Sequence, residues 1–201
     1  MVQKIIDYSG LDMWVKDKSC ILLVCDESIS FLPSISLKIS ELEKSGVKFV
    51  RFSDFCANPV YDSVVSGVRV FRDNGCDAIF AIGGGSSLDV AKCIKLYSNM
   101  PGSGESGSFL KQTVVPNSIP FLAMPTTAGT GSEATRYAVI YYEGAKQSVT
   151  SESIIPSLVL HDPLCLETLP DYQKKATAMD ALCHAIESFW SVNGNDESKS
   201  Y

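Results

Sequence analysis

The stretch from Asp77 to Tyr97 constrains the fold most strongly. An apolar run, Ala78 to Ile82, is typical of a buried parallel strand, and three consecutive glycines end it. A helix is expected directly after the glycines, because Leu88, Ala91 and Ile94 recur at helical spacing. The stretch therefore predicts a strand, a tight turn and a helix in immediate succession.

The glycine turn, Gly83, Gly84 and Gly85, has the composition of an anion site. Residues without Cβ atoms let an anion approach the backbone, and the free N–H groups of the first helical turn point at the same place. We expect Ser86 or Ser87 to cap the helix. The pattern lacks both GxGxxG and GK[ST], however, so a phosphate cradle and a purely structural turn fit it equally well.

One further acidic residue belongs to this helix. Asp89 follows the glycines within the first turns, where a carboxylate suits the positive end of the helix dipole.

The first part of the chain alternates strand and helix patterns. Cys20 to Cys25 is an apolar run followed by Asp26, Pro33 to Ser45 and Tyr61 to Asn74 are helical patterns, and Val47 to Phe52 is a second strand. Such alternation predicts a parallel sheet, in which ligands bind at the carboxyl ends of the strands. Asp26 and the glycine turn should both lie at that edge.

The middle of the chain is expected to contain two loops. Met100 to Asn117 is rich in Gly, Ser and Pro and is interpreted as a surface loop. Thr126 to Glu133, after a strand over Ile119 to Pro125, is either a ligand-binding loop or a polar turn with a helix cap. Three more strands are expected, at Tyr137 to Tyr142, Gln147 to Thr150 and Ser157 to Leu160.

The amino-acid composition limits the classes of partner that the protein is expected to bind. The 201 residues are 45% hydrophobic, enough for a packed core, and carry a net charge of −6 with no basic run, which argues against nucleic acid and anionic membranes. No apolar run approaches the roughly 20 residues that span a bilayer. The seven cysteines are scattered and form no C-x-x-C pair, so reduced thiols in a soluble cytoplasmic protein are expected.

The last part of the chain is helical. Tyr172 to Trp190 is one long helical pattern, or two helices that meet near Ala176. Asp180 and His184 are four residues apart on one helix face, where they could bind a metal ion or form an ordinary surface pair. Two ligands alone do not hold a catalytic metal.

Three motifs in series resemble the iron-containing alcohol dehydrogenase family: ANPVYDSVVSGVRVFRDNGCDAIFAIGGGSSLDVAK, FLAMPTTAGTGSEATRYAVI and LVLHDPLCLETLPDYQKKATAMDALCHAIESFW. The resemblance implies an α/β fold, with a Rossmann-like dinucleotide-binding domain over residues 1–168. The first helices of a truncated all-helical, metal-binding domain would follow over residues 169–201. It also implies NAD(P) and a divalent metal, iron or alternatively zinc, in the cleft between the domains.

The resemblance assigns site residues by position. It places the dinucleotide on Asp26, Asn58, Gly83, Gly84, Gly85, Ser86, Thr126, Thr127, Thr130 and Lys146. Asp26 matches the acidic position that receives the adenosine ribose. Since a carboxylate there accepts hydrogen bonds from the 2′-OH and repels a 2′-phosphate, NAD(H) is expected rather than NADP(H).

Asp180 and His184 match the first two of the family's four metal ligands. The other two, both histidines, would follow Tyr201, so little or no dehydrogenase activity is expected of the 201 residues alone.

The implied function is metal-dependent hydride transfer between NAD(H) and a small alcohol or aldehyde. ESFWSVNGNDESKSY and RYAVIYYEGAKQS resemble the branch that reduces phosphonoacetaldehyde to 2-hydroxyethylphosphonate. A non-catalytic dinucleotide-binding fragment or remnant is the alternative. A homodimer is compatible with such folds, and the oligomeric state stays open.

Overall fold

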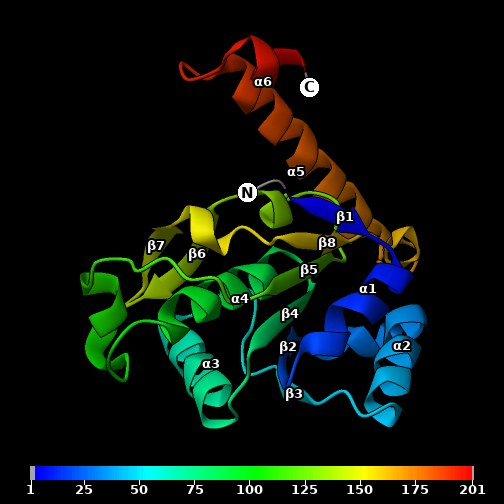
Figure 1. The fold of residues 1–201 in the computed structure, drawn as a ribbon. Helices are drawn as coiled ribbons and strands as arrows, with labels where there is room; N and C mark the ends of the chain where they lie inside the picture. The colour runs from blue at the N-terminus through cyan, green and yellow to red at the C-terminus, as the bar shows by residue number, and fades with distance from the viewer. Residues whose placement is uncertain (1–2, 201) are drawn as a thin grey trace.

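The structure, a computed structural model, describes residues 3–200 and is built on a six-stranded parallel sheet. The strand order is β1-β8-β5-β4-β2-β3 (Figure 1). The strands are β1 (Lys4–Ile6), β2 (Ile21–Cys25), β3 (Phe49–Phe52), β4 (Ala78–Gly83), β5 (Phe121–Pro125) and β8 (Leu158–Leu160). The predicted α/β fold with a parallel, Rossmann-like sheet is therefore confirmed.

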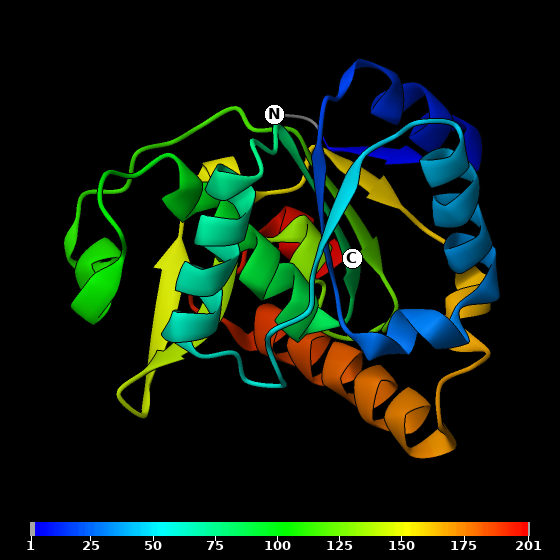
Figure 2. The same cartoon turned by 90° about the horizontal axis from the view of Figure 1, so that it is seen from below.

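Helices cover both faces of the sheet (Figure 2). They are α1 (Tyr8–Trp14) and α2 (Pro33–Lys44) on one face, and α3 (Tyr61–Asp73) and α4 (Gly85–Ser98) on the other. Both faces are buried because side chains alternate along each strand: in β2, Leu22 and Val24 pack toward α3 and α4, whereas Leu23 packs toward α1 and α2.

Short 3₁₀ helices fill the connections. They are η1 (Val15–Asp17), η2 (Glu27–Phe31), η3 (Glu105–Lys111), η4 (Ser132–Ala134), η5 (Glu152–Ile154) and η6 (Pro163–Leu166).

Strand β1 was not predicted. It is only three residues long and pairs in parallel with β8, with Lys4 opposite Leu158 and Ile6 opposite Leu160. So short a segment carries no periodic signal of its own, and its strand conformation depends on the partner at the other end of the chain.

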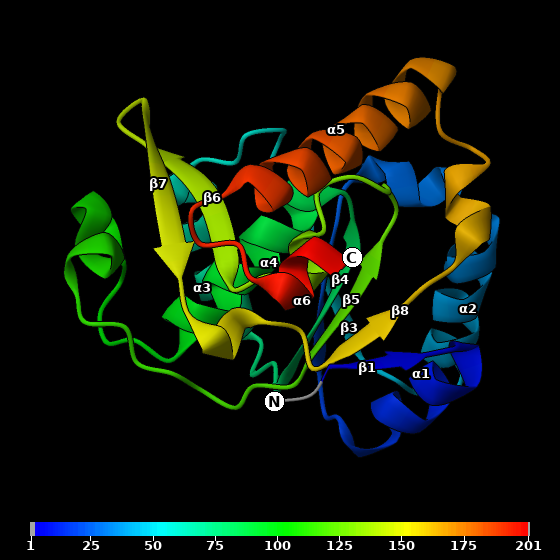
Figure 3. The same cartoon turned by 90° about the horizontal axis from the view of Figure 1, so that it is seen from above.

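Helix α4 is the most buried helix of the structure's described part. It lies between the main sheet, α3 and an antiparallel hairpin of β6 (Tyr137–Tyr142) and β7 (Ala145–Thr150) (Figure 3). The predicted hairpin is confirmed, with its second strand beginning two residues earlier. Because α4 is enclosed on several sides, even its lysines, Lys92 and Lys95, are buried.

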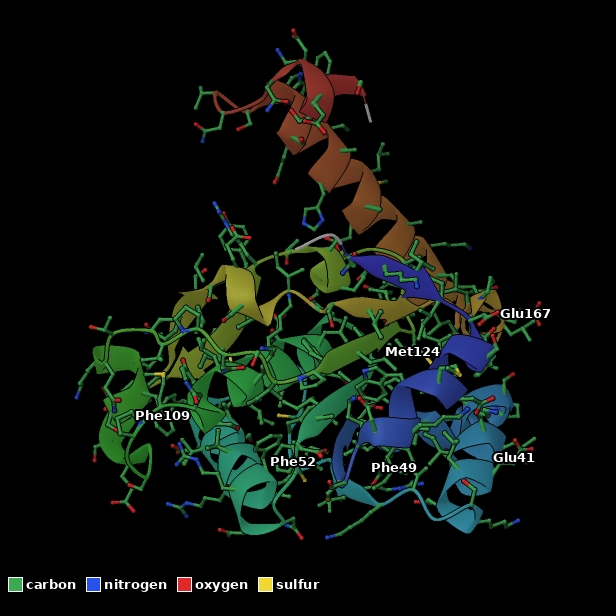
Figure 4. The ribbon with its side chains drawn as sticks, viewed as in Figure 1. Glu41, Phe49, Phe52, Phe109, Met124 and Glu167 are labelled. Atoms are coloured by element: carbon green, nitrogen blue, oxygen red, sulfur yellow. The ribbon has the colours of Figure 1, made fainter. Side chains whose placement is uncertain are left out.

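The segment from Met100 to Asn117, predicted as a surface loop, is anchored to the core. Phe109 of η3, labelled in Figure 4, is buried. Its ring stacks on that of Tyr97 of α4, with 5.0 Å between the ring centroids. The Tyr61 hydroxyl of α3 donates to the Gly104 carbonyl and accepts from the Phe109 N–H. The surface-loop prediction is thus wrong for the part around Phe109.

The last two helices differ from the rest. Helix α5 (Asp171–Trp190) is one continuous helix rather than two, and α6 (Asp196–Ser200) follows it. Figure 1 shows α5 leaving the α/β layers, and it has no buried residue. Of the helices in residues 3–200, none combines the length and apolarity needed to cross a membrane.

Candidate functional site

The glycine turn joins β4 to α4 at the carboxyl edge of the sheet. Gly83 has φ of 148°, a backbone conformation that favours glycine, and a Cβ atom there would lie 2.3 Å from Ser87 Oγ. The helix begins at Gly85, so the N–H groups of its first turn have no partner within the helix. The turn therefore presents free donors beside residues that are too crowded for side chains.

The capping prediction was wrong. The N-cap of α4 is Gly84, without a side-chain hydrogen bond, and Ser86 and Ser87 lie inside the first turn. A glycine at this position leaves the N–H groups of the first turn unoccupied by a capping side chain, which keeps them available to an anion.

The loop that follows β5 packs directly on the glycines. The Thr126 N–H donates to the Gly83 carbonyl at 3.0 Å. A Cβ atom at Gly85 would lie 2.9 Å from Thr130 Cγ2. The absence of side chains on the glycine turn thus lets this loop, residues 126–131, which we name the threonine loop, close over it.

A cavity of about 500 Å³ opens between these two loops. Its lining consists of Asp26, Ser28, Phe55, Cys56, Ala57, Gly84, Gly85, Ser86, Ser87, Thr126, Thr127, Thr130, Leu169, Gln173 and Thr177. The structure thereby brings most of the predicted dinucleotide residues to one surface, which we name the dinucleotide cavity.

Asp26 lies at the end of β2 and is the N-cap of η2. Its Oδ1 accepts a hydrogen bond from the Ser28 N–H at 2.8 Å. This bond fixes the carboxylate at the cavity wall.

A second cavity, of about 750 Å³, lies next to the first. Gly85, Ser86 and Thr130 line both cavities. On one side the second cavity is lined by Asp89 of α4, and on the other by Ala181 and His184 of α5. We name it the α4–α5 cavity. A ligand that fills both cavities would extend from Asp26 past the start of α4 toward His184.

The predicted metal ligands face each other on α5. His184 Nε2 lies 3.8 Å from Asp180 Oδ1, and both side chains are partly exposed, at 53% and 42%. Imidazole and carboxylate are donors that iron and zinc accept. No third His, Cys, Asp or Glu gathers with them within residues 3–200, and their assignment as metal ligands stays a prediction.

Four predicted site residues line neither cavity: Asn58, Gly83, Lys146 and Asp180. Lys146 is exposed on β7, opposite Tyr141 in the hairpin. Asn58 is exposed, with φ of 56°, and follows Ala57 of the dinucleotide cavity directly. The assignment of Asn58, Gly83 and Lys146 to the cofactor site stays a prediction, as does that of Asp180 to the metal site.

Several lining residues of α5 were not predicted. These are Gln173, Thr177 and Ala181, and together with the predicted His184 they recur at helical spacing and line one or other cavity. That spacing is visible in the sequence, but the face it defines could be recognised only once the position of α5 was known. Gly129 helps to set that position, since a Cβ atom there would lie 2.6 Å from the Thr177 carbonyl oxygen.

The seven cysteines all lie in the described part of the chain and are free thiols. Cys56 and Cys183 are exposed, and the other five are buried.

The chain is similar to several curated proteins. Mitochondrial hydroxyacid-oxoacid transhydrogenase of Mus musculus is 32% identical over 195 residues, which are 91% of this chain and 41% of that protein. Probable alcohol dehydrogenase EutG of Escherichia coli (strain K12) is 37% identical over 137 residues, 67% of this chain and 34% of that protein. The chain thus spans less than half the length of these relatives.

Solved structures have the same fold. A 1,3-propanediol oxidoreductase superposes with a TM-score of 0.86 and 29% identity, over 99% of this chain and 53% of the other. Sulfoacetaldehyde reductase from Bifidobacterium kashiwanohense, in complex with NAD+, has a TM-score of 0.77 and 27% identity, over 94% of this chain and 52% of the other.

The family itself is shown by a profile match. Residues 8–163 match the profile described as iron-containing alcohol dehydrogenase, which is well over half of the 201 residues. The chain therefore belongs to the iron-containing alcohol dehydrogenase family.

Proposed function

We propose that this chain is the dinucleotide-binding portion of a metal-dependent oxidoreductase that transfers hydride between NAD(H) and a small alcohol or aldehyde. The observation that carries the proposal is the dinucleotide cavity. It combines a carboxylate, Asp26, with the free N–H groups at the start of α4 and with Thr126, Thr127 and Thr130. These are the groups that a ribose and a pyrophosphate require.

The pyrophosphate is assigned to the start of α4. Backbone N–H donors and the positive end of a 14-residue helix both favour an anion at Gly84 to Ser86. The adenosine ribose is assigned to Asp26, whose charge repels a 2′-phosphate. We therefore propose NAD(H) as the cofactor, in keeping with the NAD+ bound to the related sulfoacetaldehyde reductase.

The nicotinamide end is assigned to the α4–α5 cavity, next to His184. Asp180 and His184 would hold part of a divalent metal site, with iron as the first choice and zinc as the alternative. When bound, such a metal supplies a Lewis acid that polarises a carbonyl oxygen. The chain's own contribution is to place His184 on the cavity wall opposite Asp89, with Asp180 3.8 Å from it on the same helix.

The substrate is assigned more coarsely. Among the described residues, neither cavity is lined by a lysine or an arginine. Phosphonoacetaldehyde, which the sequence resemblance suggests, would therefore need a cation other than the residues that line the two cavities to pair with its phosphonate.

A second candidate is hydride exchange between a hydroxyacid and an oxoacid. It is favoured by the transhydrogenase relatives, which match 91% of this chain, as opposed to 67% for the bacterial alcohol dehydrogenase. A non-catalytic dinucleotide-binding fragment has less support, because the chain retains Asp180 and His184 facing each other on α5.

The test is a fluorescence titration of the purified chain with NADH and NADPH. NADH should bind at least about tenfold more tightly than NADPH, a difference of about 1.4 kcal/mol. Asp26→Ser should remove most of this preference. Serine can still accept the Ser28 N–H as an N-cap, so η2 keeps its capping bond while the negative charge is lost.

Asp7→Ser is the matched control. Asp7 is also an acidic N-cap, accepting the Gly10 N–H at the start of α1, but it lines neither cavity. Its substitution should leave the ratio of the two affinities unchanged. Equal affinity of the unsubstituted chain for NADH and NADPH would contradict the ribose assignment, and no binding of either would contradict the proposed function.

A further inference from the structure

Helix α4 carries an acid and a base that hold one neighbouring segment. Asp89 accepts hydrogen bonds through both carboxylate oxygens, from Ser132 Oγ at 2.8 Å and from the Val139 N–H at 2.9 Å. Both donors belong to the stretch that runs from η4 into β6. Asp89 thus fixes two ends of this stretch, which we name the 132–139 segment.

Lys92 lies one turn further along the same helix and is fully buried. Its Nζ donates to Ser132 Oγ at 3.1 Å, to Thr135 Oγ1 at 3.2 Å and to the Tyr137 carbonyl at 2.8 Å. An ammonium group has three N–H donors, so each has an acceptor, and all three acceptors lie in the 132–139 segment. Ser132 Oγ joins the two charged residues by bonding to both.

The held segment forms one wall of the candidate site. Ser132, Thr135, Tyr137 and Val139 line the α4–α5 cavity, whereas Lys92 lines neither cavity. The segment also continues from the threonine loop, whose Thr130 packs on Gly85. Any influence of Lys92 on a bound dinucleotide must therefore pass through the position of this wall.

Burial and the neighbouring acidic groups have opposite effects on the pKa of Lys92. Burial lowers the pKa of Lys92 to about 8, against the opposing attraction of Asp89, Cys93 and Glu133. Burial also raises the pKa of Asp89. A buried charge without partners is costly, so the hydrogen bonds to the segment are what make a buried ammonium tolerable at neutral pH.

We propose that Lys92 is a positioning residue for the dinucleotide site, whose ammonium group holds the 132–139 segment against α4 in the geometry that the cofactor requires. This inference rests on the proposed function. It predicts that loss of the ammonium group loosens the segment locally and weakens cofactor binding, although Lys92 does not touch the cavity.

The experiment compares Lys92→Met with Lys95→Met. Lys95 is a close match: it lies one turn further along α4, is 3% exposed, and has a pKa that burial also lowers to about 8. It donates, however, to the carbonyl and the side-chain oxygen of Asn117, at 3.0 and 2.7 Å, outside the 132–139 segment. Both substitutions remove one buried ammonium from the same helix.

Two quantities are measured on each folded variant. Hydrogen exchange of the amides in the 132–139 segment should accelerate about tenfold or more in Lys92→Met, and NADH should bind about tenfold more weakly. Lys95→Met should leave both unchanged. The proposal is overturned if the two variants behave alike, or if the segment exchanges at the original rate in Lys92→Met.

The exchange measurement needs no cofactor. Failure of the unsubstituted chain to bind NADH would therefore count against the proposed function, whereas slow exchange in Lys92→Met would count against the positioning role. Should Lys92→Met not fold, Thr135→Val removes a single acceptor of the ammonium and should give a smaller acceleration in the same amides. Unchanged exchange in that variant would also overturn the proposal.

The pH dependence separates positioning from plain stabilisation. The neutral amine that forms above pH 8 has two N–H donors for three acceptors, so NADH affinity should fall as the pH rises through about 8. The contribution of Lys92 to the free energy of unfolding should instead increase with pH. The unfolded chain keeps the lysine proton up to the ordinary pKa of 10.5, so between about 8 and 10.5 it binds more protons than the folded chain, and stability rises with pH.

The pH-dependent fall in affinity should persist in Lys95→Met and disappear in Lys92→Met. Its persistence in Lys92→Met would assign the fall to another group and contradict the role of Lys92.

Discussion

The α/β layers and helix α5 bury their apolar side chains to opposite extents. Phe80 of β4 has no exposed surface, whereas Trp190 at the end of α5 is 78% exposed, and α5 has no buried residue at all. The layers therefore carry their own stability through packing. Helix α5 contributes residues to both cavities, but it is held by few contacts, among them the approach of Gly129 to Thr177.

The largest effect is expected from Phe80→Ala. The substitution leaves a cavity in the core between the sheet and helices α1 and α2. It should lower the free energy of unfolding by about 3 to 5 kcal/mol. Urea denaturation measures it. Trp190→Ala is the control and should change stability by no more than about 0.5 kcal/mol. Comparable losses in both variants would show that α5 is part of the same packed unit.

A smaller effect is expected at the junction of the two regions. In Gly129→Ala the new Cβ atom would lie 2.6 Å from the Thr177 carbonyl oxygen, so α5 or the threonine loop must shift. Such overpacking should cost about 1 to 3 kcal/mol. Hydrogen exchange should accelerate in residues 173–184 and stay unchanged in β4. Unaltered exchange along α5 would mean that this contact does not hold the helix.

The smallest effect on folding is expected from His184→Ala. Its side chain is 53% exposed, so the free energy of unfolding should change by no more than about 0.5 kcal/mol. Its predicted effect is on metal content, which elemental analysis of the full-length protein should show to be reduced relative to the unsubstituted protein. Cys183→Ala, on the neighbouring exposed residue, is the control and should retain the metal. Equal metal content in both variants would remove His184 from the proposed ligand set.

The sequence predicted the layers better than the site. Strand β4 and helix α4 were predictable because burial on both faces produces a continuous apolar run and a regular helical pattern. Strand β1 was not, because its three residues depend on β8. The serine caps were predicted from propensity, but the crowded approach of the threonine loop to the glycines leaves the N-cap position to Gly84.

The role of Asp89 also shows what sequence alone omits. Its position near the start of α4 suggested an interaction with the helix dipole, whereas its carboxylate accepts hydrogen bonds from Ser132 and Val139. These partners lie some forty to fifty residues away in the chain, and no local spacing indicates them. The sequence does not indicate the role of Lys92 either, because a lysine in a helix is ordinarily exposed.

The pairing of β1 with β8 has a consequence for how the chain folds. Lys4 pairs with Leu158, from which it is separated by most of the described sequence. Strand β8 must itself pair with β5 to belong to the sheet. Contacts of such long sequence separation form slowly, because the intervening chain loses conformational entropy before the contacts contribute any stabilising free energy. Strand β1 should therefore be added last, and the edge it forms should be the first part of the sheet to open in the native protein.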